Sequence, residues 1–237
     1  MTLLEILNNV LAESGFLTKT SFATNQDPDD KQMVAIANRT ITELRDFYPW
    51  SSLRSDFQIS PPDDDDSEMV TFALPGDFRS FCADSSWELD GSRMLEWPVP
   101  SSRWFLYKFS SFSSGGLGRV RQYGNTVQIQ SPGNWQPFEF EYISKFAVRG
   151  ANGTQKEYFT ADTDTPVLDD RLVTLGIQAN WAETKLLPQA GIWKQNYMQK
   201  TAEAIGRDTG AKTIGPNTVD GVSAARGAPY YPLWRPS

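Results

Sequence analysis

The sequence contains no histidine and one cysteine, Cys82. Without imidazole the chain builds no Ser-His-Asp or Cys-His pair, no histidine general base and no HExxH zinc site. One thiol makes neither an internal disulfide nor a multi-thiolate metal site, and it suits a reducing compartment. Any catalysis would have to use carboxylate, lysine or tyrosine chemistry.

Carboxylates gather at two places in the chain. The run Asp63–Asp66 offers the hard oxygen ligands that calcium prefers, but consecutive residues point in different directions and no EF-hand glycine and glutamate follow. We interpret it as a solvated loop without a metal ion. The second set is interpreted as a helix N-terminus, where acidic side chains face the positive end of the dipole; it comprises Asp162, Asp164, Asp169 and Asp170.

Two further patterns resemble catalytic motifs only in part. Glu139 and Glu141 share one face of a predicted strand, and glycosidases use two carboxyl groups about 5–10 Å apart, but any acidic protein offers such pairs. The segment Gly115–Gly118 lacks the lysine of a phosphate-binding loop and precedes strand-like residues, so we interpret it as a connection. The sequence thus predicts no enzyme, no cofactor and no metal.

Aromatic residues are abundant, at 13% of the chain with eight tryptophans. Four of these tryptophans fall in the central region: Trp87, Trp97, Trp104 and Trp135. They would suit the packed core of a β-sandwich, contacts between subunits, or a sugar-stacking platform, in that order of preference. Cys82 is expected to pack as a small apolar residue.

The C-terminal segment combines aromatic residues with proline. Residues 228–237 carry side-chain types enriched at binding hot spots, namely Tyr230, Tyr231, Leu233, Trp234 and Arg235. Prolines pre-order an extended chain, which lowers the entropy cost of binding. We therefore predict that this arm docks onto another chain; docking back onto its own domain is the alternative.

Charge differs between the body and the arm. Residues 1–206 hold 18 basic and 27 acidic residues, whereas residues 207–237 hold four basic and two acidic ones. An acidic body without a Lys/Arg cluster cannot supply the phosphate neutralisation on which most nucleic-acid affinity rests. No apolar stretch approaches about 18 residues and residues 1–10 do not form a secretory signal, so we expect a soluble protein kept inside the cell.

Helical patterns lie at both ends of the body. A capping box of Thr2 and Glu5 opens a helix that stops at Ser14, and a second helix runs from an Asp27 cap with Pro28 to a stop at Pro49. A third is expected after the cap and proline at residues 164–166. A fourth is expected between Pro188 and residue 206.

The region between these helices has short alternating runs typical of β structure. We predict strands at residues 56–60 and 69–74, a hairpin over 87–97 with an Asp90-Gly91 turn, a short helix at 102–109, and a meander of three further strands at 119–123, 126–130 and 138–143.

The expected fold is α+β. It consists of an antiparallel bundle of about four helices, interrupted by a β-rich insert of sandwich or barrel-like form and followed by an extended C-terminal arm. The divisions are 1–51 and 161–206 for the two halves of the bundle, 52–160 for the β-rich domain and 207–237 for the arm.

Several segments resemble one protein family. They include residues 1–7, Phe47–Trp50, Leu74–Phe78 and Phe140–Ser144, and most strongly Phe159–Leu172. In these segments the chain resembles the head-to-tail adaptor proteins of tailed bacteriophages, related to tail tubular protein A and to the portal-bound adaptor rings of short-tailed phages. The resemblance samples residues 1–187, and the arm is much less typical.

The resemblance implies a structural virion protein at the head–tail interface, assembled in the host cytoplasm. About twelve copies would form a ring beneath the portal protein, with the C-terminal arm on the portal and the β domain facing the tail nozzle or the next ring. DNA would pass through the lumen without sequence-specific binding, and no membrane is involved. The alternative is a tail component that binds or cleaves carbohydrate with the Trp-rich β region.

Overall fold

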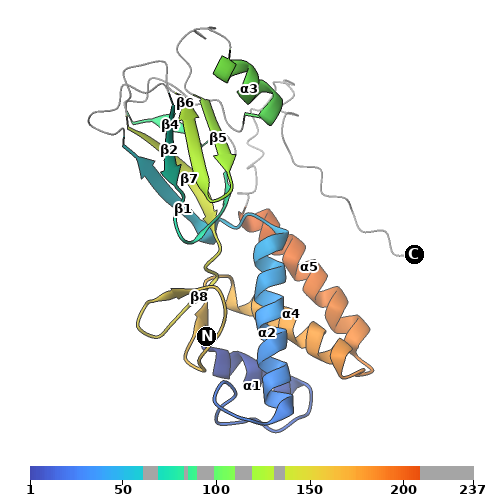
Figure 1. The fold of residues 1–237 in the computed structure, drawn as a ribbon. Helices are drawn as coiled ribbons and strands as arrows, with labels where there is room; N and C mark the ends of the chain where they lie inside the picture. Colours follow the sequence, from blue (N-terminus) through green and yellow to red (C-terminus); the bar gives the residue numbers. More distant parts are fainter. Residues whose placement is uncertain (61–68, 83–84, 90–98, 110–118, 131–136, 209–237) are drawn as a thin grey trace, which may run out of the picture.

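Helices α1, α2, α4 and α5 lie at one end of the molecule, while most of the strands and the short helix α3 lie at the other (Figure 1). This arrangement is seen in a computed structural model, described for residues 1–60, 69–82, 85–89, 99–109, 119–130 and 137–208. Within these ranges the chain mixes α-helices with small antiparallel sheets, as the sequence predicted in outline. The five α-helices of these ranges are α1 (Leu3–Glu13), α2 (Pro28–Phe47), α3 (Ser101–Phe109), α4 (Asp170–Thr184) and α5 (Ala190–Asp208), with a 3-10 turn, η1, at Ser51–Leu53.

The first two helices follow their sequence signals closely. Thr2 Oγ1 accepts from Glu5 N at 3.3 Å while Thr2 N donates to Glu5 Oε2 at 2.8 Å, so the predicted capping box is confirmed. The Asp27 carboxylate accepts from Asp29 N at 3.0 Å and caps α2, with Pro28 as its first residue. Both helices then present apolar stripes to the core, because their apolar residues recur at helical spacing.

Helix α4 is the centre of the helical region. It packs against α1, α2 and α5. All of residues 172–182 are buried except Asn180, which is half-buried. Gly176 sits where two neighbours come closest: a Cβ there would lie 2.6 Å from Thr40 Cγ2 and 3.0 Å from Tyr197 Cε2. Any larger residue at this crossing would therefore require the Thr40 and Tyr197 side chains to shift.

The predicted start of this helix was wrong. Thr165–Pro166 form a short strand, β10, and α4 begins at Asp170, where Asp169 Oδ1 accepts from Leu172 N at 3.0 Å. Asp164 could not serve as the cap because its carboxylate is engaged elsewhere. It accepts from Lys156 Nζ and from the backbone N–H groups of the loop that precedes it.

The described strands form three antiparallel sheets. The first joins β1 (Arg54–Ile59), β7 (Phe138–Ser144) and β3 (Phe78–Phe81), with β4 (Trp87–Glu88) also on β7. The second has the order β2 (Met69–Ala73), β6 (Thr126–Gln130), β5 (Arg119–Tyr123). The third, beside the helices, joins β10 to β8 (Val148–Arg149) and β9 (Gln155–Lys156).

The strand connections differ from the predicted meander. β5 and β6 pair as a hairpin with Gly124 at φ +58°, as expected, but β7 pairs with β1, β3 and β4 instead of following β6. Local alternation shows that a segment is a strand, while its partner is chosen by which apolar faces meet. Among the described strands no sheet closes into a barrel, and the expected second strand of the 87–97 hairpin lies outside the described ranges.

Two hydrophobic clusters meet at β7. One contains Phe138, Phe140 and Tyr142 together with apolar residues of the first two sheets. The other unites α1, α2, α4 and α5 and includes Ile143, the next residue of β7. Segments more than 120 residues apart in sequence, 1–47 and 168–205, thus share one core, while the strands between them build another.

Candidate functional site

Helix α5 is weakly covered for its length. Of its 19 residues only Thr201 and Ala204 are buried, while Ile192 is 65% exposed and Met198 62%. It packs against α4 along one side. Its remaining surface therefore faces solvent in the isolated chain.

One sector of the exposed surface of α5 is uncharged along the whole length of the helix. At 3.6 residues per turn, one sector of roughly 120° holds seven residues, all of them exposed: Gly191, Ile192, Gln195, Met198, Gln199, Ala202 and Gly206. The charged residues of the helix lie outside this sector, and they are Lys194, Lys200, Glu203, Arg207 and Asp208. The outer face of a surface helix is normally charged or strongly polar. We call these seven residues the neutral face.

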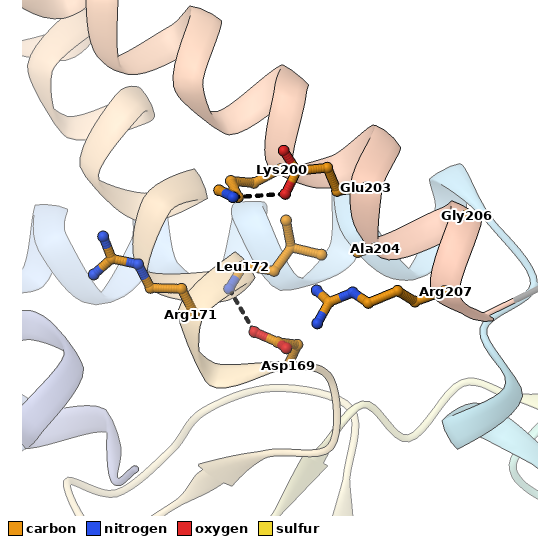
Figure 2. A pocket seen from close by; sticks show the side chains of 8 residues that line it. All are labelled: Asp169, Arg171, Leu172, Lys200, Glu203, Ala204, Gly206 and Arg207. Atoms are coloured by element: carbon orange, nitrogen blue, oxygen red, sulfur yellow. Dashed lines mark hydrogen bonds and ion pairs between the residues drawn. The ribbon is translucent and has the colours of Figure 1, made fainter. Parts of the chain in front are cut away.

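A groove lies beside the neutral face, between the start of α4 and the end of α5 (Figure 2). It has a volume of about 780 Å³. Lys200 Nζ donates to Glu203 Oε2 at 2.6 Å across its wall, and this contact holds the pKa of the Glu203 carboxyl below its usual range. Arg171 and Arg207, which also line the groove, form no hydrogen bond or ion pair with any described residue.

A smaller recess of about 290 Å³ continues this groove toward the β region. It shares Leu172 and Arg207 with the groove and reaches Trp50. Asp208 closes its end, where its carboxylate accepts from Ser51 N at 3.0 Å. Asp208, the last described residue, therefore lies at the edge of this recess.

The predicted tryptophan platform is not assembled by the described residues. Trp104 is 3% exposed and packs inward, as the preferred interpretation expected, while Trp87 is 47% exposed. Trp97 and Trp135 lie outside the described ranges. A carbohydrate site in this region stays a prediction.

Sequence reasoning missed a cluster of three aromatic rings around Arg121. The Arg121 guanidinium carbon lies 6.0 Å from the Trp104 ring centroid, 5.7 Å from that of Phe105 and 5.5 Å from that of Tyr123. Phe105 and Tyr123 are themselves 52% and 63% exposed. Tyrosine and arginine at one exposed spot are typical of interaction surfaces. Alternation within β5 could have indicated Arg121 and Tyr123, which share one strand face, but not the approach of α3.

Of the carboxylates that the sequence analysis singled out, some stabilise loops of the fold and others lie on the surface. Glu139 and Glu141 share the predicted face of β7, and Glu141 pairs with Arg54 at 3.5 Å. Asp162, expected at a helix N-terminus, instead accepts from Phe22 N and Ala23 N at 3.0 Å each and fixes the loop between α1 and α2. Within the described ranges no three acidic or cysteine side chains gather as a metal site.

Several predicted sites fall outside the described ranges. These are the acidic run Asp63–Asp66, the segment Gly115–Gly118, and the arm residues Tyr230, Tyr231, Leu233, Trp234 and Arg235. Cys82 lies within them, packs partly against the helical core as expected, and has its thiol pKa raised by burial. No helix among the described residues is long and apolar enough to cross a membrane.

No protein-family model and no curated protein sequence matches this chain.

Proposed function

We propose that the chain is a structural subunit of a head-to-tail adaptor ring, which joins a portal protein to the tail and passes DNA through its lumen. The neutral face of α5 carries this proposal. Ile192 and Met198 are more than 60% exposed on a helix that has few buried residues of its own. A face of this kind is typical of a surface that becomes buried when subunits assemble.

The charge of the chain explains why assembly would use an uncharged face. Residues 1–206 hold 27 acidic and 18 basic residues, so copies of the body repel one another. A contact without charges avoids both like-charge juxtaposition and the cost of burying ions. The small residues Gly191, Ala202 and Gly206 also allow another backbone to approach closely.

The distribution of the two hydrophobic clusters supports an adaptor organisation. The first and last helices share one cluster and the strands of the first two sheets build most of the other, as expected for a helical bundle interrupted by a β-rich insert. In this proposal residues 1–51 and 161–206 form the ring body, residues 52–160 face the tail nozzle or the next ring, and residues 207–237 reach the portal.

The lumen and the arm are assigned by charge and residue type. An acidic body does not retain phosphate, so DNA can leave the ring without being held. The arm carries Tyr230, Tyr231, Leu233, Trp234 and Arg235, which we propose as its anchors on the portal. The protein would act without catalysis or cofactor, as a component of the virion.

The mass of the purified chain, alone and mixed with its portal protein, tests the proposal. We expect a complex of about twelve copies with the portal, and deletion of residues 216–237 should abolish portal binding while the circular dichroism spectrum is kept. Unimpaired portal binding by the truncated chain would refute the role of the arm. A monomer in both samples, combined with a glycan-array signal that Trp97→Ala removes, would favour the carbohydrate alternative.

A further inference from the structure

A second pocket opens at the other end of the helical region, where α1 and α4 end and α2 begins. Its volume is about 460 Å³, within the range of roughly 300–1,000 Å³ found for ligand pockets. The apolar part of its wall is formed by Leu11, Phe16, Leu17, Met33 and Trp181. At its rim Leu17 is 89% exposed and Phe16 46%. We call this the Trp181 pocket.

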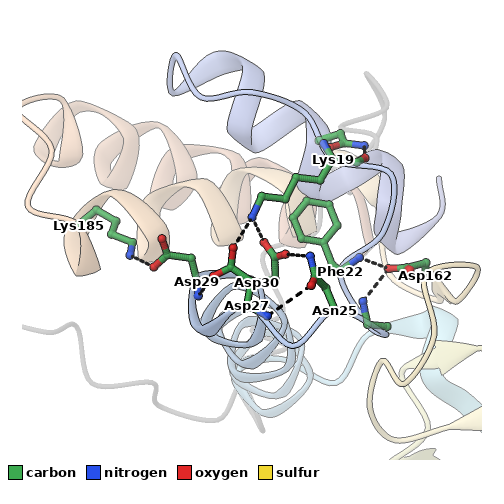
Figure 3. A network of polar contacts seen from close by, with 10 residues as sticks. Lys19, Phe22, Asn25, Asp27, Asp29, Asp30, Asp162 and Lys185 are labelled. Atoms are coloured by element: carbon green, nitrogen blue, oxygen red, sulfur yellow. Dashed lines mark hydrogen bonds and ion pairs between the residues drawn. The ribbon is translucent and has the colours of Figure 1, made fainter.

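The charges around the Trp181 pocket are already neutralised (Figure 3). Lys19 pairs with Asp30 and, at 3.3 Å, with Asp27, while Lys185 Nζ lies 2.8 Å from Asp29 Oδ1. No cation of this pocket is therefore free to bind phosphate, which argues against nucleic acid or an anionic lipid headgroup as its ligand. The apolar wall favours a peptide with large apolar side chains instead.

One polar atom of the wall lacks a partner. Trp181 is 3% exposed, and its Nε1 finds no hydrogen-bond acceptor among the described residues. Phe16 packs edge-on against the indole, with the ring centroids 6.4 Å apart, and is itself 46% exposed. A ligand that replaces Phe16 and brings a carbonyl oxygen would satisfy this donor, whose isolation otherwise destabilises the folded chain.

We propose that the Trp181 pocket binds residues 228–237 of the same chain. This segment supplies Tyr230, Tyr231, Leu233 and Trp234 for the apolar wall. Its prolines at 229, 232 and 236 have no N–H but keep their carbonyl acceptors, and aromatic-lined grooves bind proline-rich peptides.

The length of the connecting chain permits this contact within one molecule. Nineteen residues, 209–227, separate Asp208 from the binding segment. Such a chain spans up to roughly 63 Å when fully extended. The distance along α5 from its end to its start, beside the pocket, is about 28 Å for 19 residues. Attachment also raises the effective concentration of the segment at the pocket, into the millimolar range for a short linker.

The pocket would hold the arm until a partner takes it. Because the same side chains are the proposed portal anchors, pocket and portal would compete for them, but binding in the pocket does not depend on a ring or a portal. Failure of the experiment below would leave the proposed adaptor function standing, since it uses the isolated full-length chain.

Photo-crosslinking in the full-length chain tests the proposal. A benzophenone amino acid at Leu17, on the rim, should crosslink to residues 227–237, which trypsin releases as one fragment because Arg226 is cleavable and Arg235 precedes a proline. The same group at Tyr123, also exposed but on β5, is the matched control and should give at least fivefold less of this product. Absence of the fragment from the Leu17 products would overturn the proposal.

Variants of the arm and of the pocket identify the contacts. The double change L233A/W234A should lower the Leu17 crosslink at least fivefold, whereas Thr218→Ala in the connecting chain should leave it unchanged. Trp181→Phe keeps an aromatic side chain but replaces the indole with a smaller phenyl ring and removes the N–H. It should lower the yield about threefold while the circular dichroism spectrum stays unchanged. An unchanged crosslink yield from L233A/W234A would contradict the assignment. Crosslinks that join an isotopically labelled chain to an unlabelled one would also contradict it, because they would show contact between two molecules.

Discussion

Lys156 Nζ lies 2.8 Å from Asp164 Oδ1, and Asp164 is only 1% exposed. The other carboxylate oxygen accepts from the backbone N–H groups of Thr160 and Ala161. Burial opposes ionisation of Asp164, but the lysine and the two amides together outweigh it and hold the pKa of this carboxyl below its usual value of 3.8. The ion pair thus fixes the loop that leads into β10 and α4.

This ion pair makes stability sensitive to acid. Because the pKa of Asp164 is lower in the folded chain than in the unfolded chain, its contribution is fully present well above pH 3.8 and is lost as the pH falls through the lower native value. Asp164→Asn should cost about 2 kcal/mol of unfolding free energy at pH 7. Urea unfolding of both proteins at pH 7 and pH 3 should show this difference shrinking in acid. An unchanged difference at pH 3 would contradict the assignment.

The crossing at Gly176 predicts an overpacking defect. A Cβ placed 2.6 Å from Thr40 Cγ2 must displace the packed Thr40 side chain or helix α2, so Gly176→Ala should destabilise the chain by about 1–3 kcal/mol. The matched control is Gly206→Ala in α5, where a Cβ would meet no atom within 4 Å. This change should raise the free energy of unfolding by a few tenths of a kcal/mol, because alanine has a higher helix propensity than glycine. Thermal unfolding of both variants checks the prediction, and equal midpoints would count against it.

Charges placed on the neutral face should block assembly without unfolding the subunit. Met198 is 62% exposed, so Met198→Lys is expected to change the unfolding free energy by less than about 0.5 kcal/mol. If the face packs against another chain, the buried ammonium should weaken assembly at least tenfold. Analytical ultracentrifugation measures this, with Asn196→Lys, exposed but outside the face, as control. Assembly unaffected by Met198→Lys would remove the main support for the proposed function.

Alkaline pH should reveal two protected tyrosines. Burial and a hydrogen bond to Asp77 raise the pKa of Tyr142 to about 12, and burial beside Glu43 raises that of Tyr197 to about 12. A phenol with a raised native pKa contributes stability that is complete below pH 10 and is lost as the pH rises toward 12. Absorbance titration at 295 nm should show Tyr142→Phe removing one late-ionising group. The same number of late groups in both proteins would refute the protection of Tyr142.

Local signals in the sequence predicted the ends of α1 and α2, because a capping box, a proline at the first turn and a helix-ending proline act within a few residues. They failed where a residue is used by a distant part of the fold. Asp164 has the sequence context of a helix cap, yet Lys156 and a loop compete for its carboxylate. The pairing of β7 with β1 depended on which apolar faces meet, which strand alternation does not encode.

The candidate surfaces also divide into those that local sequence patterns predict and those that depend on tertiary packing. The neutral face of α5 is readable from the sequence once the helix is drawn as a wheel, because the placement of Lys194, Lys200 and Glu203 follows from helical spacing alone. The approach of Arg121 to Trp104 and Phe105 joins a strand to a helix, and the Trp181 pocket joins the ends of three helices. Such junctions follow from tertiary packing, which no local pattern specifies.

Strand β7 has a mechanical consequence for any partner that pulls on this protein. Tyr142 belongs to one hydrophobic cluster and Ile143 to the other, so a continuous backbone connects the two. β7 is also paired along its length with β1, so tension along the strands would shear many hydrogen bonds at once instead of peeling them singly. Force applied to the β region would therefore reach the helices with little stretching between them.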